Sequence, residues 1–239
     1  MRRLLRADLR RILKRISLHI WLFFVFVLFF MCSIGGDYTS DIIAMQQSAV
    51  ASLAPILVSI PVFLSVYGRE LRAGSMQCVI GRGLSRPRLI LTKYLECVLL
   101  CLFFYTFIWL AFFLRNNVGD AGLTASQNRL LTIYVLTVFI RTCGYFAFTS
   151  FFFFLSWSIA PSIVALLVSA FLMPVLVRLA QSLLKIDFYD FYFDGLIENA
   201  YASIAAGEIG FGLITAIVLY IGGALLLTVL VFRKKEIEF

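Results

Sequence analysis

Long apolar runs dominate this sequence and leave it one kind of fold. Six segments are apolar over about 20 residues or more, the length at which an α-helix crosses a bilayer. They lie at about 16–34, 42–67, 89–114, 130–155, 159–178 and 209–232. Only 14% of the 239 residues are charged, against about a quarter in soluble domains. We therefore predict an all-α, polytopic membrane protein with six transmembrane helices that forms a single domain over 1–239.

The connection between the fourth and fifth runs is short. The chain passes from one to the other within the stretch Ser156 to Pro161, and proline is tolerated in the first turn of a helix. We predict two helices joined by a tight turn at this point. The second, third and fourth runs exceed the length needed to cross a bilayer, so these helices should tilt or protrude.

Lysine and arginine are distributed unevenly among the connections. With the N-terminus inside the cell, sixteen of the 21 lie in cytoplasmic segments, which precede the first run, separate the second from the third, and follow the sixth. This bias predicts a multi-pass plasma-membrane protein with both termini in the cytoplasm. The net charge of +8 then reflects topology and contact with anionic headgroups of the lipid bilayer, so we expect no nucleic-acid partner.

The first fifteen residues have a helical charge pattern. Leu5, Leu9, Ile12 and Leu13 fall on one side of a helix, and basic residues cover the other side. We predict an amphipathic N-terminal interfacial helix over 1–15 that lies in the headgroup plane. The alternative is a disordered basic tail that only sets topology.

The segment 179–208 joins the fifth and sixth runs and alternates acids with aromatic residues. Aromatic rings with polar tips favour the membrane interface, so we expect short helices or a re-entrant element at the outer surface. Asp187, Asp190 and Asp194 could instead form a metal site. We favour the interface, because aromatic residues separate the three acids, and predict no metal site.

The sequence lacks the residues of common catalytic centres. His19 is the only histidine, which excludes a multi-histidine metal site. No Gly-Lys dipeptide occurs, so the chain cannot form the phosphate-binding loop GxxxxGK[ST]. The five cysteines do not suggest a disulfide framework, and we interpret them as packing residues. Lys93 and Glu96, three residues apart, fit a local ion pair better than a proton relay. We expect no enzyme activity and no metal or cofactor bound by this chain.

Three polar residues at membrane depth are candidates for a substrate path or gate. Arg141 lies near the middle of the fourth run, where a buried arginine usually faces a bundle interior, a partner or water. Two alternatives are a structural pair with an acid and a side chain that extends to the interface. Gln46 and Gln47 lie near the outer end of the second run, whose prolines could free carbonyls toward a cavity. We expect Arg141→Ala to alter transport more than folding.

The segment 68–88 is a polar, basic island between the second and third runs. It contains an acid, a glycine four residues later, a hydroxyl residue next, and a Ser-Arg pair. A lysine follows this arginine by seven residues, in the third run. These positions are Glu70, Gly74, Ser75, Ser85-Arg86 and Lys93. Their spacing resembles the signature region of type-2 ATP-binding-cassette transporter permeases. The order of the runs, the basic N-terminus and the tight turn resemble the same family, so the likeness covers essentially the whole chain.

This resemblance implies a cytoplasmic coupling segment over 68–88. A short helix around 69–80 would dock into a groove on a cytoplasmic ATPase that binds ATP and Mg²⁺, and glycines would permit close approach and a turn. Closure of two ATPase chains would then rock a pair of permeases between inward- and outward-open states. The residues assigned to docking and coupling are Arg69, Glu70, Arg72, Gly74, Ser75, Gly83, Ser85, Arg86 and Lys93.

The resemblance also implies the membrane subunit of an exporter, paired with an identical or paralogous permease. The short outer loops resemble the small permeases that export peptides, drugs or lipid-like compounds, including those conferring immunity to lantibiotics. The main alternative is a non-transporting sensor or scaffold whose basic loop binds a cytosolic partner. An ion-driven transporter should carry acids at mid-membrane, and none occurs there in the first five runs.

Overall fold

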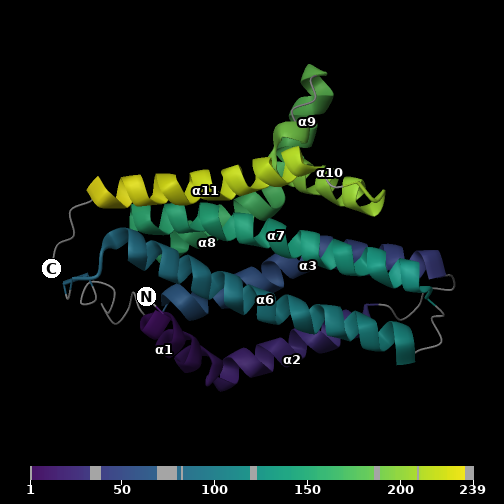
Figure 1. Ribbon diagram of the computed structural model, residues 1–239, viewed down its shortest axis with the longest axis horizontal. Helices are drawn as coiled ribbons and strands as arrows, with labels where there is room; N and C mark the ends of the chain where they lie inside the picture. Colours follow the sequence, from purple (N-terminus) through teal and green to yellow (C-terminus); the bar gives the residue numbers. More distant parts are fainter. Residues whose placement is uncertain are drawn as a thin grey trace.

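The computed structural model describes residues 2–32, 39–68, 80–81, 83–118, 123–185, 189–208 and 210–234. Every secondary-structure element within these ranges is helical (Figure 1). The elements are α1 (Arg2–Leu13), α2 (Ile16–Met31), α3 (Thr39–Phe63), η1 (Leu64–Gly68), α6 (Arg86–Val118), α7 (Ala125–Ser156), α8 (Ile159–Leu167), η2 (Val168–Leu172), α9 (Met173–Leu184), η3 (Tyr189–Phe191), α10 (Phe193–Ala205) and α11 (Phe211–Lys234).

Five helical segments of the described chain are long and apolar enough to cross a membrane. They are Ile42–Gly68, Arg86–Asn117, Ala125–Ser156, Ile159–Leu184 and Phe211–Arg233. Helices α1 and α2 meet at a bend of 69° and would add a sixth span if the pair is counted as one. The all-α prediction is confirmed for the described residues, and the five to six helical segments long and apolar enough to cross a membrane are compatible with a multi-pass membrane protein.

Two of the helices are longer than their apolar runs predict. Helix α6 has 33 residues and α7 has 32, so each is about 50 Å long at 1.5 Å per residue. A bilayer core is only about 30 Å thick. Helix α7 begins early because Thr124 and Gln127 form a capping box, in which each side chain bonds the other's backbone N–H group. Both helices therefore tilt or extend beyond the hydrocarbon region.

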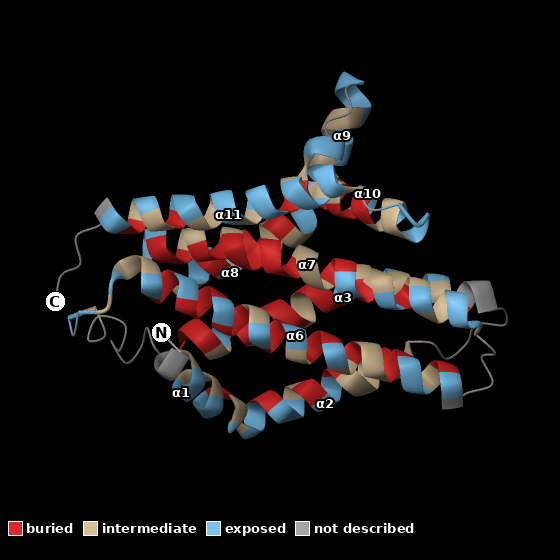
Figure 2. Cartoon of the chain, in the orientation of Figure 1, coloured by how far each residue is buried: buried red, intermediate tan, exposed pale blue. Residues whose placement is uncertain are grey.

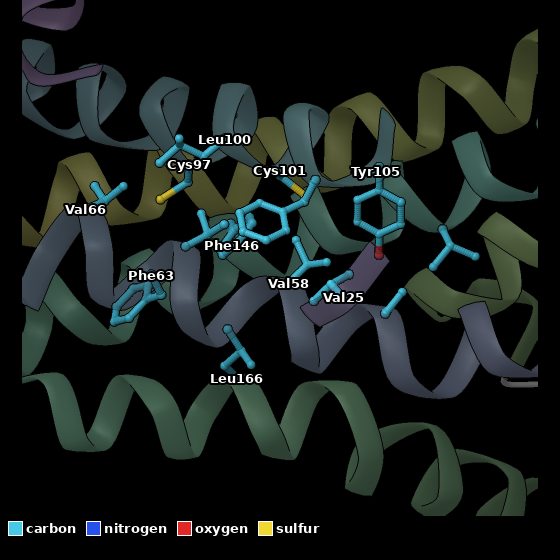
Figure 3. Packing of buried hydrophobic residues seen from close by; sticks show 14 of the residues in the cluster. Val25, Val58, Phe63, Val66, Cys97, Leu100, Cys101, Tyr105, Phe146 and Leu166 are labelled. Carbon is cyan, nitrogen blue, oxygen red and sulfur yellow. The ribbon is translucent and has the colours of Figure 1, made fainter. Parts of the chain in front are cut away.

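Helix α7 is the centre of the bundle and contacts α3, α6, α8, α10 and α11. Most of its middle and C-terminal half is buried, whereas α9 and α11 are largely exposed (Figure 2). The core contains side chains from α2, α3, α6, α7 and α8, among them Val25, Val58, Phe63, Phe146 and Leu166 (Figure 3). Buried Cys97 and Cys101 are free thiols in this core, as expected for packing residues.

The tight turn predicted between the fourth and fifth runs is present. Helix α7 ends at Ser156, and Trp157 has a left-handed backbone with a φ of 55°. Its N–H group donates to the Phe153 carbonyl at 2.7 Å, which closes the helix. Its ring stacks on Phe232 of α11, with ring centres 5.4 Å apart and 10° between the planes. This contact stabilises Trp157 in a left-handed backbone conformation that non-glycine residues rarely adopt.

The connection 179–208 contains short helices, as the sequence predicts. Helix α9 runs on to Leu184, so the fifth helical segment is longer than the predicted 159–178. The short helix η3 and then α10 follow, and α10 packs against α7 and α11. Asp194 lies in the first turn of α10, which brings an acid from this connection into the bundle.

Candidate functional site

Arg141 lies half-way along α7 and reaches across to α3. Its Nη2 atom donates a hydrogen bond to the Ala51 carbonyl at 2.5 Å. In a regular helix that carbonyl would bond the N–H group four residues later, but position 55 is a proline and has no N–H. Arg141 therefore binds the carbonyl that Pro55 leaves without a helical partner.

Trp21 of α2 has the same role at the second proline of α3. Its indole Nε1 donates to the Leu57 carbonyl at 2.7 Å, and Pro61 removes the N–H group that Leu57 would otherwise bond. The prolines do free two carbonyls, as predicted from the sequence. Each of these carbonyls accepts a hydrogen bond from a neighbouring helix. Leu57 and Pro61 also line a groove beside α2, so the expectation that the carbonyls open toward a cavity stays a prediction.

Asp194 is an acid whose charge acts on Arg141, and it is 1% exposed. Its Oδ1 atom accepts a hydrogen bond from the Tyr145 hydroxyl at 2.7 Å, and Tyr145 follows Arg141 by one turn of α7. The Oδ2 atom of Asp194 and the Nε atom of Arg141 are buried without a hydrogen-bond partner in the described structure. Burial raises the pKa of Asp194, while the charge of Arg141 acts in the opposite direction. We call Arg141, Tyr145 and Asp194 the Arg141 cluster.

One sequence pattern points to this cluster. Arg141 and Tyr145 have the spacing of residues on one helix face, which points to a polar stripe on α7. No sequence signal points to Asp194 as a partner, because it lies in the connection between two apolar runs. The charge of Asp194 acts on Arg141, which favours the alternative of a structural partner acid, while extension of the side chain to the interface stays an alternative.

Gln46 and Gln47 point to different neighbours. The Gln47 amide donates to the Tyr201 hydroxyl of α10 at 3.1 Å. Gln47 lies one helical turn before Ala51, whose carbonyl Arg141 binds, so Gln47 borders the Arg141 cluster. Gln46 is fully buried and donates to the Asn116 side chain of α6 at 2.8 Å. The structure thus brings Gln47 near Arg141 and directs Gln46 to a separate contact between α3 and α6.

The two described aspartates of the 179–208 connection have different partners. Asp190 is exposed and accepts a hydrogen bond from Asn199 at 3.3 Å, whereas Asp194 is buried against Tyr145. Asp187 lies outside the described residues. No group of three potential metal ligands occurs among His, Cys, Asp and Glu of the described ranges.

The start of α10 is held by close backbone packing. A Cβ atom on Gly195 would lie 1.8 Å from the Tyr189 carbonyl oxygen, and one on Gly144 would lie 2.1 Å from the Phe193 ring. Tyr189 also donates to Glu198 at 2.8 Å. Burial and this carboxylate raise the pKa of Tyr189 to about 12, so the phenol stays protonated as a donor near neutral pH. These contacts fix the position of Asp194.

A second polar centre lies at the start of α6. Lys93 is 1% exposed, and its ammonium group lies 2.9 Å from Asp8 of α1 and 3.0 Å from Glu96. The predicted Lys93–Glu96 ion pair is confirmed. The contact to Asp8 could not be read from local spacing, and it joins α1 to α6.

Arg86 joins the start of α6 to the end of α11. Its Nη1 atom donates to the carbonyls of Phe232 at 2.8 Å and Arg233 at 3.1 Å, and its guanidinium lies over the Phe232 ring at 5.4 Å. A cation at the C-terminus of a helix also opposes the partial negative charge there. We call Asp8, Arg86, Lys93, Glu96 and Phe232 the α6 junction.

Only part of the predicted coupling segment falls within the described residues. Gly83 has a φ of 91° in a turn closed by its N–H group to the Ile80 carbonyl, as predicted for a turning glycine. Ser85 is exposed and its carbonyl accepts from Leu89 at the start of α6. The residues outside the described ranges are Arg69, Glu70, Arg72, Gly74 and Ser75, together with most of the helix predicted at 69–80.

Loss of the Asp8 contact should loosen α1 without unfolding the bundle. We expect Asp8→Asn to lower the free energy of unfolding by about 1 to 2 kcal/mol, because Lys93 keeps Glu96 but loses one charged partner. Limited proteolysis should then cleave the first fifteen residues faster. Arg11→Gln is the matched control, since Arg11 makes a more exposed ion pair to the same carboxylate at 3.3 Å and should change cleavage little. Equal cleavage of both variants would contradict the role of Lys93 in holding α1.

Comparison with known families gave one match. The family model described as "Protein of unknown function (DUF2705)" matches residues 11–238. A comparison with curated proteins gave no match. The matched range includes α2 to α11, the Arg141 cluster, and the whole α6 junction except Asp8.

Proposed function

Because the chain belongs to the DUF2705 family of proteins of unknown function, we propose a function from its own residues. We propose that it is the permease subunit of an ATP-driven exporter, which moves a peptide, drug or other amphipathic compound out of the cell. In this proposal a separate ATPase chain binds the cytoplasmic segment 68–88. The permease works with a second copy or a paralogue.

The observation that carries this proposal is the α6 junction. The segment 68–88 connects η1, where α3 ends, to α6. At the start of α6, Lys93 contacts α1 and Arg86 contacts the last turn of α11. A force applied to this segment would therefore reach α1, α3, α6 and α11 directly. Such a connection suits a coupling element better than a topogenic loop, which requires only charge.

The proposed topology places the α6 junction at the cytoplasmic face. Both chain ends then lie in the cytoplasm of a plasma-membrane protein, and α1 is the interfacial helix. Its side chains support this placement, since Ile12 is buried and Arg6, Arg10 and Lys14 are exposed. The Arg141 cluster then lies within the membrane and is the proposed gate, with Gln47 at its border.

Coupling is tested by co-expressing this protein with a candidate ABC-type ATPase chain and purifying the two together. Gly74→Trp should abolish co-purification, and Glu70→Ala should reduce the ATP hydrolysis of the complex at least tenfold. Arg115→Gln is the control, because Arg115 lies in the last turn of α6, far along the helix from the junction, and should leave both unchanged.

Normal binding and hydrolysis in both segment variants would contradict the coupling role. Capture of a cytosolic partner other than an ATPase would favour the sensor or scaffold. Transport that follows a proton gradient without ATP, and is lost in Asp194→Asn, would indicate an ion-driven transporter that uses the buried acid.

A further inference from the structure

A groove of about 560 Å³ lies between α2 and the end of α3. Two side-chain hydrogen bonds cross from α2 to α3 along this groove. Arg15 donates to the Ser65 carbonyl at 3.2 Å, and Trp21 donates to the Leu57 carbonyl at 2.7 Å. Pro61 and the π-helical turn η1 interrupt the regular backbone hydrogen bonding of α3 at these points. The irregular end of α3 thus forms one wall of the groove.

The lining of the groove suits an amphiphilic ligand. It combines a larger apolar surface, which includes Leu18 and Ile60, with the polar residues Arg15, Ser17 and Ser65. Arg15 is the charged residue in this lining. From Arg15 to Trp21 the helix rises about 9 Å, which is less than one leaflet of a bilayer core of about 30 Å. A headgroup at Arg15 would place its chain beside Leu18, Trp21 and Ile60.

The charge near the groove favours an anionic headgroup. Arg15 lies at the bend between α1 and α2. Arg10 and Arg11 lie in the last turn of α1, and Lys14 follows that helix. Arg10, Arg11 and Lys14 are exposed. A cluster of basic residues next to an apolar groove attracts anionic lipid electrostatically, and guanidinium groups bind phosphate oxygens in a forked geometry. A zwitterionic lipid has no net charge, so this cluster of basic residues would not attract it in the same way.

We propose that this groove is a binding site for an anionic phospholipid of the surrounding membrane. The phosphate lies against Arg15 and Ser17, and one acyl chain lies along Leu18, Trp21 and Ile60. A bound chain would pack against Pro61 and η1, where the helix precedes the segment 68–88. The site therefore makes the end of α3 responsive to the lipid composition of the membrane. This inference does not depend on the proposed ATPase or on export.

The test uses Trp21 as a reporter within the groove. The full-length protein carries Trp109→Phe and Trp157→Phe, which leave Trp21 as the only tryptophan. It is reconstituted in vesicles of phosphatidylcholine mixed with brominated phosphatidylglycerol or with brominated phosphatidylcholine. Bromine quenches tryptophan on contact. We expect the anionic lipid to displace the zwitterionic one at Trp21 with a preference of about fivefold, the contribution of one basic residue near an anionic surface.

Two pairs of variants separate the groove from general surface attraction. Arg15→Gln should abolish the preference, whereas Lys14→Gln, which removes the same charge from an exposed neighbour outside the groove, should keep most of it. Leu64→Phe fills the groove and should reduce quenching by both lipids. Leu53→Phe, an exposed position of α3 outside the lining, should not.

Three outcomes would overturn the proposal. These are equal quenching by the two lipids, equal loss of preference in Arg15→Gln and Lys14→Gln, and unchanged quenching in Leu64→Phe. Competition by inorganic phosphate alone would assign Arg15 to a free anion instead of a lipid. Circular dichroism and size-exclusion chromatography of each variant show whether it keeps the helical fold before quenching is measured.

Discussion

Replacing Gly195 with alanine should lower the free energy of unfolding by about 4 kcal/mol, a large effect for a single methyl group. The added Cβ would lie 1.8 Å from the Tyr189 carbonyl oxygen, which is a backbone atom and cannot swing away. Either η3 or the first turn of α10 must move. Because Asp194 lies one residue before Gly195, its hydrogen bond to Tyr145 should be lost with the displacement. Unfolding in mixed micelles with increasing SDS measures the change.

The same substitution elsewhere in the chain supplies the control. Gly222 lies within α11, and a Cβ atom there would meet nothing within 4 Å. Gly222→Ala should therefore be neutral or stabilise the protein by up to about 1 kcal/mol, since alanine favours helix more than glycine does. A stability loss in Gly195→Ala no larger than that in Gly222→Ala would contradict the close packing at the start of α10.

Replacing Arg141 with methionine should lower the free energy of unfolding by about 3 kcal/mol. The change leaves the Ala51 carbonyl without a partner beside Pro55, and it removes the positive charge nearest to buried Asp194. The expectation from sequence, that Arg141→Ala alters transport more than folding, stays a prediction, and these contacts add an expected effect on folding. Unfolding in SDS mixed micelles and transport in vesicles, measured on the same preparations, separate the two effects.

A double-mutant cycle isolates the electrostatic part of this effect. Asp194→Asn keeps an oxygen for the Tyr145 hydroxyl but removes the charge, so Arg141→Met should cost about 2 kcal/mol less in its presence. Arg178→Met is the control, because Arg178 also faces an acid of α10, Glu198, at 3.0 Å but is 60% exposed. It should cost less than about 1 kcal/mol. Additive effects of Arg141→Met and Asp194→Asn would show that the two charges act independently.

Features set by local sequence were predicted correctly. The apolar runs locate the helices, because a segment in lipid must satisfy its own backbone hydrogen bonds. Likewise Pro161 marks the turn after α7, and the spacing of Lys93 and Glu96 gives their ion pair. Helix ends were less accurate, since α6 and α7 continue into polar residues whose caps and packing extend them.

Contacts between distant segments could not be predicted from one sequence. The two carbonyls freed in α3 were expected, but their donors, Arg141 and Trp21, lie 90 and 36 residues away. Asp194 reaches the bundle only because η3 and α10 fold back against α7. Asp8 joins Lys93 only once α1 packs on α6. In each case the partner depends on tertiary packing, for which local spacing carries no signal.

The position of Phe232 bears on the assembly of the protein during synthesis. Its ring stacks on Trp157 and its carbonyl accepts from Arg86, although it follows these two residues in the chain by 75 and 146 positions. Helix α11 is therefore made after α6 and α7. Until it packs against them, the turn after α7 and the start of α6 lack their aromatic and carbonyl partners. A chain whose synthesis stops before α11 would leave this end of the bundle open.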